Sequence, residues 1–257
     1  MGAGGAPMAR RRRLEPRGVL TVPTEPAVLA LEFHAVRKTA DFSFLREPER
    51  AGRLLQVDPL EDHLVQRLSM ERQSHLLLER LRVPPTLILA YCGCAALAAH
   101  TAALCDADLL LVDPDVVDPN IAHRDFLQLC ATLNFDPAAC GDTARTGWLT
   151  QWDVVLAATR DRLAAEYGGD LEAYEMVDDL FERYRSWARF LEASLNTGPA
   201  NPDGEVTVIS GRPVPNLGAL LASPERAGIH QVTPNADTLS LPEVQDLVRQ
   251  AFHKACG

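Results

Sequence analysis

Short apolar segments alternate with helical segments over most of the chain, and this alternation limits the possible folds more than any other feature. Each apolar segment has the length of a strand that is buried on both faces. Strands that alternate with helices in this way are typical of an α/β fold, in which helices flank a mostly parallel sheet. The expected strands cover residues 27–33, 53–57, 86–90, 107–112, 205–210 and 228–233. The helices expected to flank them cover residues 60–81, 95–104 and 242–254.

A block of helical periodicity without a strand interrupts this alternation between residues 120 and 203. An all-helical block between two strands of an α/β sheet indicates a lid. We therefore expect one domain over residues 19–257, with a helical lid at about 120–203. The helices expected in the lid cover residues 125–133, 152–167 and 171–195.

Charge and composition exclude several classes of protein. The 257 residues include 25 Lys and Arg against 35 Asp and Glu, a formal net charge of −10, which argues against a nucleic-acid binder. Residues 1–18 hold five arginines and no apolar run, which predicts a disordered basic extension rather than a secretory signal. No apolar stretch reaches the ~18 residues of a membrane span, so we expect a cytoplasmic protein. The sequence has no motif for a metal or a nucleotide, and no resident cofactor is expected.

The segment around Cys92 is the main candidate for chemistry. The expected strand 86–90 leads through Tyr91 to Cys92, and a helix follows within a few residues. A nucleophile at such a junction forms a nucleophile elbow, where small neighbours such as Gly93 leave room for a cramped backbone. The helix N-terminus is expected to lower the pKa of the Cys92 thiol and to offer N–H groups to an oxyanion. The alternative is a buried cysteine without a chemical role.

The elbow and the segments that follow it resemble a known family. The order AYCGCAALAAH, LLLVDPD, helical block, VTVISG and IHQVTPNADTLSLPEVQDLV is similar to that of the α/β-hydrolase thioesterases of polyketide and nonribosomal peptide biosynthesis. The family's elbow reads G-Y-S-x-G. The resemblance therefore implies an α/β-hydrolase fold with Cys92 as the nucleophile in place of serine. It also implies that Asp113 is the catalytic acid, with Asp115 as the close alternative.

The resemblance assigns further positions around the nucleophile. It places the oxyanion donors at the backbone of Gly93 and of Ala35, although the loop that contains Ala35 lacks the family's glycines. It also implies an acyl pocket shaped by the lid, for which the candidate side chains are Tyr91, Trp148 and Trp152.

The chain departs from the family at the catalytic histidine. The loop after the last expected strand contains no histidine, and Asp237 or Thr238 stands at the expected position. His34 and His230 are the remaining candidates for a base near Cys92. Each also has an ordinary interpretation, His34 as a loop residue and His230 as a strand residue.

Two functions remain open at this point. In the first, the protein is a thioesterase-like enzyme that takes an acyl group from an acyl or peptidyl carrier protein onto Cys92 and releases it by hydrolysis, cyclisation or transfer. The acyl group arrives on the phosphopantetheine of the carrier. In the second, the protein is a catalytically degenerate hydrolase fold that acts as a ligand-binding or scaffold partner. Because carrier proteins are acidic, docking is expected at basic side chains. The candidates are Arg37, Lys38, Arg183, Arg185 and Arg189.

Overall fold

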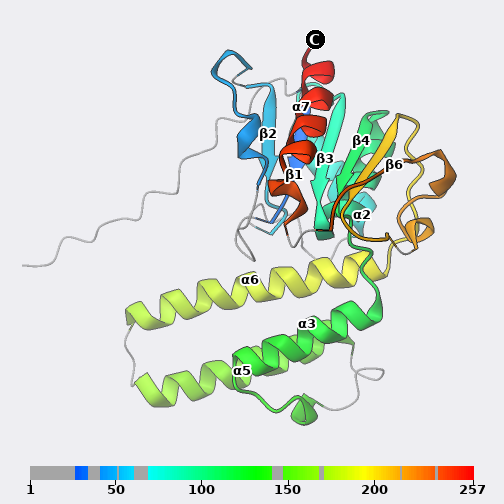
Figure 1. The fold of residues 1–257 in the computed structure, drawn as a ribbon. Helices are drawn as coiled ribbons and strands as arrows, with labels where there is room; N and C mark the ends of the chain where they lie inside the picture. Colours follow the sequence, from blue (N-terminus) through cyan, green and yellow to red (C-terminus); the bar gives the residue numbers. More distant parts are fainter. Residues whose placement is uncertain are drawn as a thin grey trace, which may run out of the picture.

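Six parallel strands form a single sheet in the computed structural model (Figure 1). The structure describes residues 27–33, 41–50, 52–60, 69–140, 147–167, 171–214, 216–234 and 237–257. The strand order is β2-β1-β3-β4-β5-β6, and every neighbouring pair is parallel. The strands are β1 (Val28–Leu31), β2 (Leu54–Val57), β3 (Leu87–Tyr91), β4 (Asp108–Val112), β5 (Val206–Ser210) and β6 (Gly228–Gln231). The predicted α/β class is therefore confirmed.

The central strands are apolar because helices and loops cover both of their faces. β1 is fully buried along its length, and β3 pairs with it in the register Leu89 to Ala30. β6 is exposed at all four positions and forms one edge of the sheet. The strand ends lie within about two residues of the predicted ends.

Helices pack on both faces of the sheet. α1 (Met70–Glu79) and α2 (Ala95–Cys105) share one apolar core with one face. α7 (Pro242–Cys256) covers the other face through Val244, Val248 and Phe252, which recur every four residues and are fully buried. Of the predicted helix over 60–81, the structure describes α1, which begins at Met70, where the Ser69 side chain accepts a hydrogen bond from the Arg72 N–H. Residues 61–68 lie outside the described part of the chain.

The chain between β4 and β5 forms a helical insert, as expected. Its long helices are α3 (Pro119–Thr132), α5 (Trp148–Tyr167) and α6 (Leu171–Leu195), and they lie together at the end of the sheet where β3 and β4 finish (Figure 1). The insert has its own apolar core, which includes Phe126, Trp152 and Leu191. Within the described residues, none of the helices combines the length and the apolar character that a membrane span needs.

Candidate active site

Cys92 stands at a strained turn between β3 and α2. β3 ends at Tyr91, a single 3-10 turn covers Cys92–Cys94, and α2 starts at Ala95. The φ of Cys92 is +54°, in the left-handed region that residues other than glycine rarely adopt. Such strain persists only where the surrounding structure imposes it, and a strained residue between a strand and a helix is the geometry of a nucleophile elbow. The backbone thus has the local form that the sequence predicted.

The elbow also lies at the point where the strand order of the sheet reverses. β2 lies on one side of β1, whereas β3 and all later strands lie on the other side. In open α/β sheets, ligands bind outside the carboxyl ends of the strands at this reversal. Cys92 directly follows the carboxyl end of β3, so the topology places it at the expected position of a ligand site.

Asp115 is the carboxylate that contacts Cys92. The Cys92 thiol donates a hydrogen bond to Asp115 Oδ2 at 2.9 Å. The backbone joins the same two residues, since the Asp115 N–H donates to the Cys92 carbonyl at 3.2 Å. Arg212, two residues after the end of β5, forms an ion pair with Asp115 Oδ1. The cysteine, the carboxylate and the guanidinium therefore form a connected row across the ends of β3, β4 and β5.

Asp113 is held differently, although the resemblance favoured it as the acid. It is buried at the end of β4 and has a φ of +43°. Its Oδ1 accepts hydrogen bonds from the Ser210 hydroxyl at 2.9 Å and from the Gly211 N–H at 2.9 Å. These contacts tie the end of β4 to the end of β5. The structure thus brings the alternative, Asp115, to the thiol and turns Asp113 towards β5.

The pKa of the Cys92 thiol is raised to about 12. Burial is the largest cause, and the charge and hydrogen bond of Asp115 add to it, while the Gly93 N–H and the Arg212 charge act in the opposite direction. The prediction that the helix N-terminus lowers this pKa was therefore wrong. The Gly93 N–H does favour the thiolate, but desolvation and a neighbouring carboxylate outweigh it. The cysteine is a neutral thiol at physiological pH.

Tyr91 and Asp237 belong to the same electrostatic cluster. The pKa of Tyr91 is raised to about 12, by burial first and by the charges of Cys92, Asp237 and Asp113 as well. The pKa of Asp237 is also raised, by burial first and by the charge of Asp113 as well. Asp237, at the position where the family has its histidine, therefore lies within electrostatic range of Asp113 and Tyr91. Its neighbour Thr238 is fully buried.

Gly93 packs beneath an aromatic cluster from β1 and the helical insert. A Cβ on Gly93 would lie 3.3 Å from Phe33 Cε2 and 3.8 Å from Trp187 Cη2, so the residue after Cys92 has little room for a side chain. The Phe33 ring meets Trp187 edge to face at 5.0 Å and Phe190 at 5.1 Å. α6 of the insert therefore covers the elbow. Of the two expected oxyanion residues, Gly93 is described here, whereas Ala35 and its neighbour His34, the other candidate base, lie outside the described residues.

The remaining candidates lie away from Cys92 or outside the described side chains. His230 is exposed on the edge strand β6, three strands from β3, and lines a pocket that does not include Cys92. Trp152 is 2 % exposed and packs against Phe126 and Tyr184 inside the insert. The side chain of Trp148 is not among those described. The structure therefore brings neither His230 nor Trp152 to Cys92.

Cys92 does not line either of two pockets formed by described residues. The first, of about 480 Å³, lies beside α2, and the second, of about 520 Å³, lies between α7 and the strands β3 to β6. Among the described residues, no group of three or more His, Cys, Asp or Glu is placed to hold a metal ion.

Sequence reasoning missed Arg212 and Trp187. Arg212 reaches Asp115 across 97 positions of sequence, and Trp187 reaches Gly93 from the insert. The one available signal for Arg212 was its position two residues after a strand. Because the carboxyl ends of parallel strands meet at one edge, such a residue can reach the end of a neighbouring strand. Trp187 stands in the helical pattern of α6 like any other apolar residue.

Comparison with known proteins assigns no family to the chain. No protein-family model matches the sequence, and no curated protein is significantly similar to it. The coarse description that the structure supports is an α/β fold with a six-stranded parallel sheet and a strained cysteine at the end of a central strand.

Proposed function

We propose that the protein is a thioesterase-like acyltransferase of the α/β-hydrolase fold, with Cys92 as its nucleophile. One observation carries the proposal: a cysteine in the left-handed region, at the strand–helix junction after β3, donates its S–H directly to a carboxylate. A structural cysteine needs neither feature. The position of the helical insert directly after β4 also agrees with the lid of such an enzyme.

In this proposal Asp115 takes the part of the missing histidine. As Sγ attacks the carbonyl carbon of the acyl thioester, the thiol proton passes to Asp115 Oδ2, which already accepts it at 2.9 Å. The oxyanion is stabilised by the Gly93 N–H. The C–S bond to the carrier thiol then breaks, and the departing thiolate takes the proton from Asp115. Arg212 holds the carboxylate in place through Oδ1, which leaves Oδ2 directed at the sulfur.

The raised pKa of Cys92 makes a nearby proton acceptor essential. With a pKa of about 12, the thiolate is a minor species near neutral pH, so the thiol must lose its proton during attack. A carboxylate is a weaker base than imidazole, and we therefore expect slow acylation. The acyl-enzyme is then released by water, by a nucleophile within the acyl chain, or by an acceptor thiol or amine.

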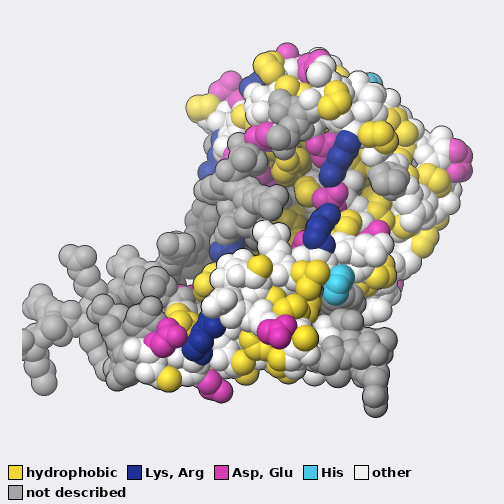
Figure 2. Space-filling model, turned by 60° about the horizontal axis from the view of Figure 1, so that its bottom comes forward, with side chains coloured by type: hydrophobic (Ala, Val, Ile, Leu, Met, Phe, Trp, Pro, Cys, Tyr) yellow, Lys and Arg dark blue, Asp and Glu magenta, His cyan; other side chains and the backbone are white. Residues whose placement is uncertain are grey.

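The proposed acyl donor is an acyl or peptidyl carrier protein, which would dock at basic side chains of this chain. Arg183 and Arg185, two expected docking residues, form ion pairs with carboxylates of this chain, Arg183 with Asp58 and Arg185 with Asp153 and Glu182. Figure 2 shows basic and acidic side chains mixed on the face that carries the insert, rather than one continuous basic patch among the described residues. Arg189 is the remaining described candidate, since Arg37 and Lys38 lie outside the described part.

Intact-mass spectrometry tests the proposal. The protein is incubated with acetyl-N-acetylcysteamine thioester, and a single acetyl adduct is expected on the wild type. Cys92→Ala should abolish the adduct, whereas the control Cys105→Ala, at the far end of α2, should retain it. An adduct of equal yield on Cys92→Ala would refute Cys92 as the nucleophile.

A binding or scaffold function is the second candidate, and the raised pKa of Cys92 favours it. A neutral, partly buried thiol next to a carboxylate is a poor resting nucleophile. If no thioester acylates the wild type at pH 7 or pH 9, the degenerate hydrolase fold becomes the better description.

A further inference from the structure

Arg212 is a basic side chain beside Cys92, and most of its hydrogen-bonding capacity is unused. Its backbone N–H donates to Ser210 Oγ at 3.2 Å, which holds the residue just after the end of β5. Its Nη2 pairs with Asp115 Oδ1, and 55 % of the side chain is exposed. Among the described residues, Nε and Nη1 have no hydrogen-bond partner.

The guanidinium of Arg212 has room for a second carboxylate. A guanidinium is planar and carries five N–H donors, of which Asp115 takes one. Nη2 carries two hydrogens, and the hydrogen that Asp115 leaves lies on the same edge of the plane as either Nε–H or Nη1–H. Two parallel donors on one edge match the two oxygens of a carboxylate. A ligand can therefore bind Arg212 while the ion pair with Asp115 stays intact.

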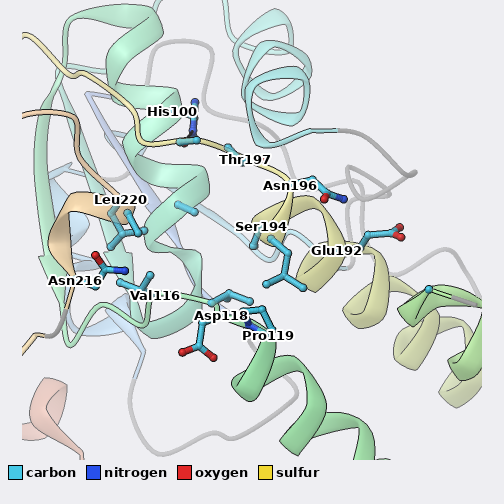
Figure 3. A pocket seen from close by; sticks show the side chains of 16 residues that line it. His100, Val116, Asp118, Pro119, Glu192, Ser194, Asn196, Thr197, Asn216 and Leu220 are labelled. Carbon is cyan, nitrogen blue, oxygen red and sulfur yellow. Dashed lines mark hydrogen bonds between the residues drawn. The ribbon is translucent and has the colours of Figure 1, made fainter. Parts of the chain in front are cut away.

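The segments that carry this ion pair lie side by side at the carboxyl end of the sheet. Val116 directly follows Asp115, Asn216 stands four residues after Arg212, and both line the first pocket (Figure 3). Burial and the charge of Asp115 raise the pKa of the Cys92 thiol, and the charge of Arg212 opposes them. The guanidinium therefore lies within electrostatic range of the sulfur, and an anion bound to it would lie beside the thiol.

The distance from the thiol to the guanidinium suits a short ligand. Cys92 Sγ lies 2.9 Å from Asp115 Oδ2, and Arg212 binds the other oxygen of the same carboxylate. Since a charge-assisted hydrogen bond spans ~2.7–2.9 Å, Nη2 lies at most about 8 Å from the sulfur. A carbon under attack lies ~3–3.5 Å from its nucleophile, and a carboxylate on the next carbon can span the remaining distance.

The acidic surroundings make this cation decisive for an anionic ligand. Asp115 contacts the thiol, and Asp237 lies within electrostatic range of Tyr91. The chain as a whole has a formal net charge of −10. A carboxylate ligand meets repulsion from these groups, so its approach to Cys92 depends on the attraction of Arg212.

We propose that Arg212 anchors carboxylates, and that Cys92 reacts preferentially with small electrophiles that carry a carboxylate within a few bonds of the attacked carbon. The inference uses the cysteine of the proposed function, but it does not need acyl transfer, because alkylation of the thiol reports the same preference. Among acyl donors, it favours monothioesters of short dicarboxylic acids.

Two alkylating reagents of the same size test this proposal. Iodoacetate and iodoacetamide differ in one terminal group, which is a carboxylate in the first and a neutral amide in the second. In both reactions the S–C bond forms as the C–I bond breaks, iodide leaves, and the thiol proton passes to solvent. The ratio of the two rates at Cys92, measured by peptide mass spectrometry at pH 8, cancels the reactivity of the thiol itself. The same ratio at Cys105, at the far end of α2, is the internal reference.

Substitutions separate the anchor from the general charge of the chain. The iodoacetate-to-iodoacetamide ratio at Cys92 should fall about tenfold in Arg212→Gln. In Asp115→Asn the ratio should rise about tenfold, because the guanidinium is no longer shared with a second carboxylate. Arg160→Gln is the matched control, since Arg160 forms a similarly exposed ion pair with Asp178 within the helical insert, and it should leave the ratio unchanged.

The outcomes are independent of those for the proposed function. An equal ratio in the wild type and in Arg212→Gln would overturn the anchor, whether or not a thioester acylates the protein. An equal fall in Arg160→Gln would also overturn it, because the general charge of the chain would then explain the effect. A fall confined to Arg212→Gln supports the anchor even if no thioester acylates Cys92, and in that case only the proposed acyl transfer fails.

Discussion

Replacing Asp115 by asparagine should change two reactivities of Cys92 in opposite directions. Asp115 accepts the thiol hydrogen bond at 2.9 Å, and its negative charge opposes formation of the thiolate. Asp115→Asn keeps the shape of the side chain and removes the charge. The Arg212 charge, which favours the thiolate, then acts without its neutralising partner. The pKa of Cys92 must therefore fall, and the loss of the proton acceptor must slow acyl transfer.

The expected size of the effect follows from the pKa of about 12 against 9.0 for an ordinary thiol. At pH 8 these values give a thiolate fraction of about 10⁻⁴ for Cys92 and about 10⁻¹ for an ordinary thiol. Alkylation of wild-type Cys92 is therefore expected to be about 10³ times slower than that of a free thiol. Loss of a charge in contact shifts a pKa by about one unit or more, which raises the thiolate fraction about tenfold in Asp115→Asn.

Two assays on the same protein measure these reactivities. Iodoacetamide labelling of Cys92, followed by peptide mass spectrometry from pH 7 to pH 10, should become about tenfold faster in Asp115→Asn. Acylation by acetyl-N-acetylcysteamine should become at least about tenfold slower, because a general base contributes ~10²–10⁴-fold. Asp153→Asn is the matched control, since it also removes a carboxylate from an arginine ion pair, far from the elbow. Alkylation that does not rise in Asp115→Asn would refute the electrostatic reasoning. Acylation that rises together with alkylation would refute Asp115 as the base.

Three further substitutions have expected outcomes. The free energy of unfolding, measured in urea, should be about 1 kcal/mol higher for Cys92→Gly than for Cys92→Ala, because glycine adopts the φ of +54° without strain. Equal values would show that the turn is relaxed in both variants. Gly204→Ala should lower the free energy of unfolding by about 1–3 kcal/mol, because the added Cβ would lie 2.4 Å from the Ala107 carbonyl oxygen. In the control Gly218→Ala, the added Cβ has no atom within 4 Å, and the free energy of unfolding should stay unchanged. Asp237→His places an imidazole where the thioesterases that the sequence resembles have their histidine. Under the proposed function, it should raise the rate of Cys92 acylation by about tenfold or more. An unchanged rate would show that this position does not reach the thiol.

The sequence was sufficient for the strands and for the elbow, because both depend on local patterns. The apolar runs are short and bounded by turn residues, so their ends could be placed within about two residues. Helix starts were less accurate. α3 begins at Pro119 rather than at the predicted residue 125, because the Asp118 side chain accepts a hydrogen bond from the Ile121 N–H and Pro119 occupies the first turn. That Asp-Pro pair was a usable signal for a helix start.

The choice between Asp113 and Asp115 could not be made from the sequence. Both carboxylates lie within three residues of the end of β4, and the turn between them decides which one meets the thiol. A φ of +43° at Asp113 directs that side chain to Ser210 on β5 and leaves Asp115 beside Cys92. The raised pKa of Cys92 escaped prediction for the same reason, since burial and the contact with Asp115 exist only in the folded chain.

The charged groups at the elbow depend on the order of the strands more than on any motif. Asp115 follows β4, Arg212 follows β5 and Asp237 follows β6, and these strands are neighbours only in the order β3-β4-β5-β6. Because all of them are parallel, their carboxyl ends meet at one edge, which brings Asp115 and Arg212 to Cys92 and Asp237 into electrostatic range of Tyr91. An apolar pattern predicts where strands lie but not which strands are adjacent in the sheet. The sequence could therefore single out Cys92 but not the residues that contact it. The Asp115–Arg212 pair to which we assign the part of a histidine is therefore a property of the tertiary fold. Variants of Arg212 that free Asp115 should alter the reactivity of Cys92, although Arg212 itself has no hydrogen bond to the thiol.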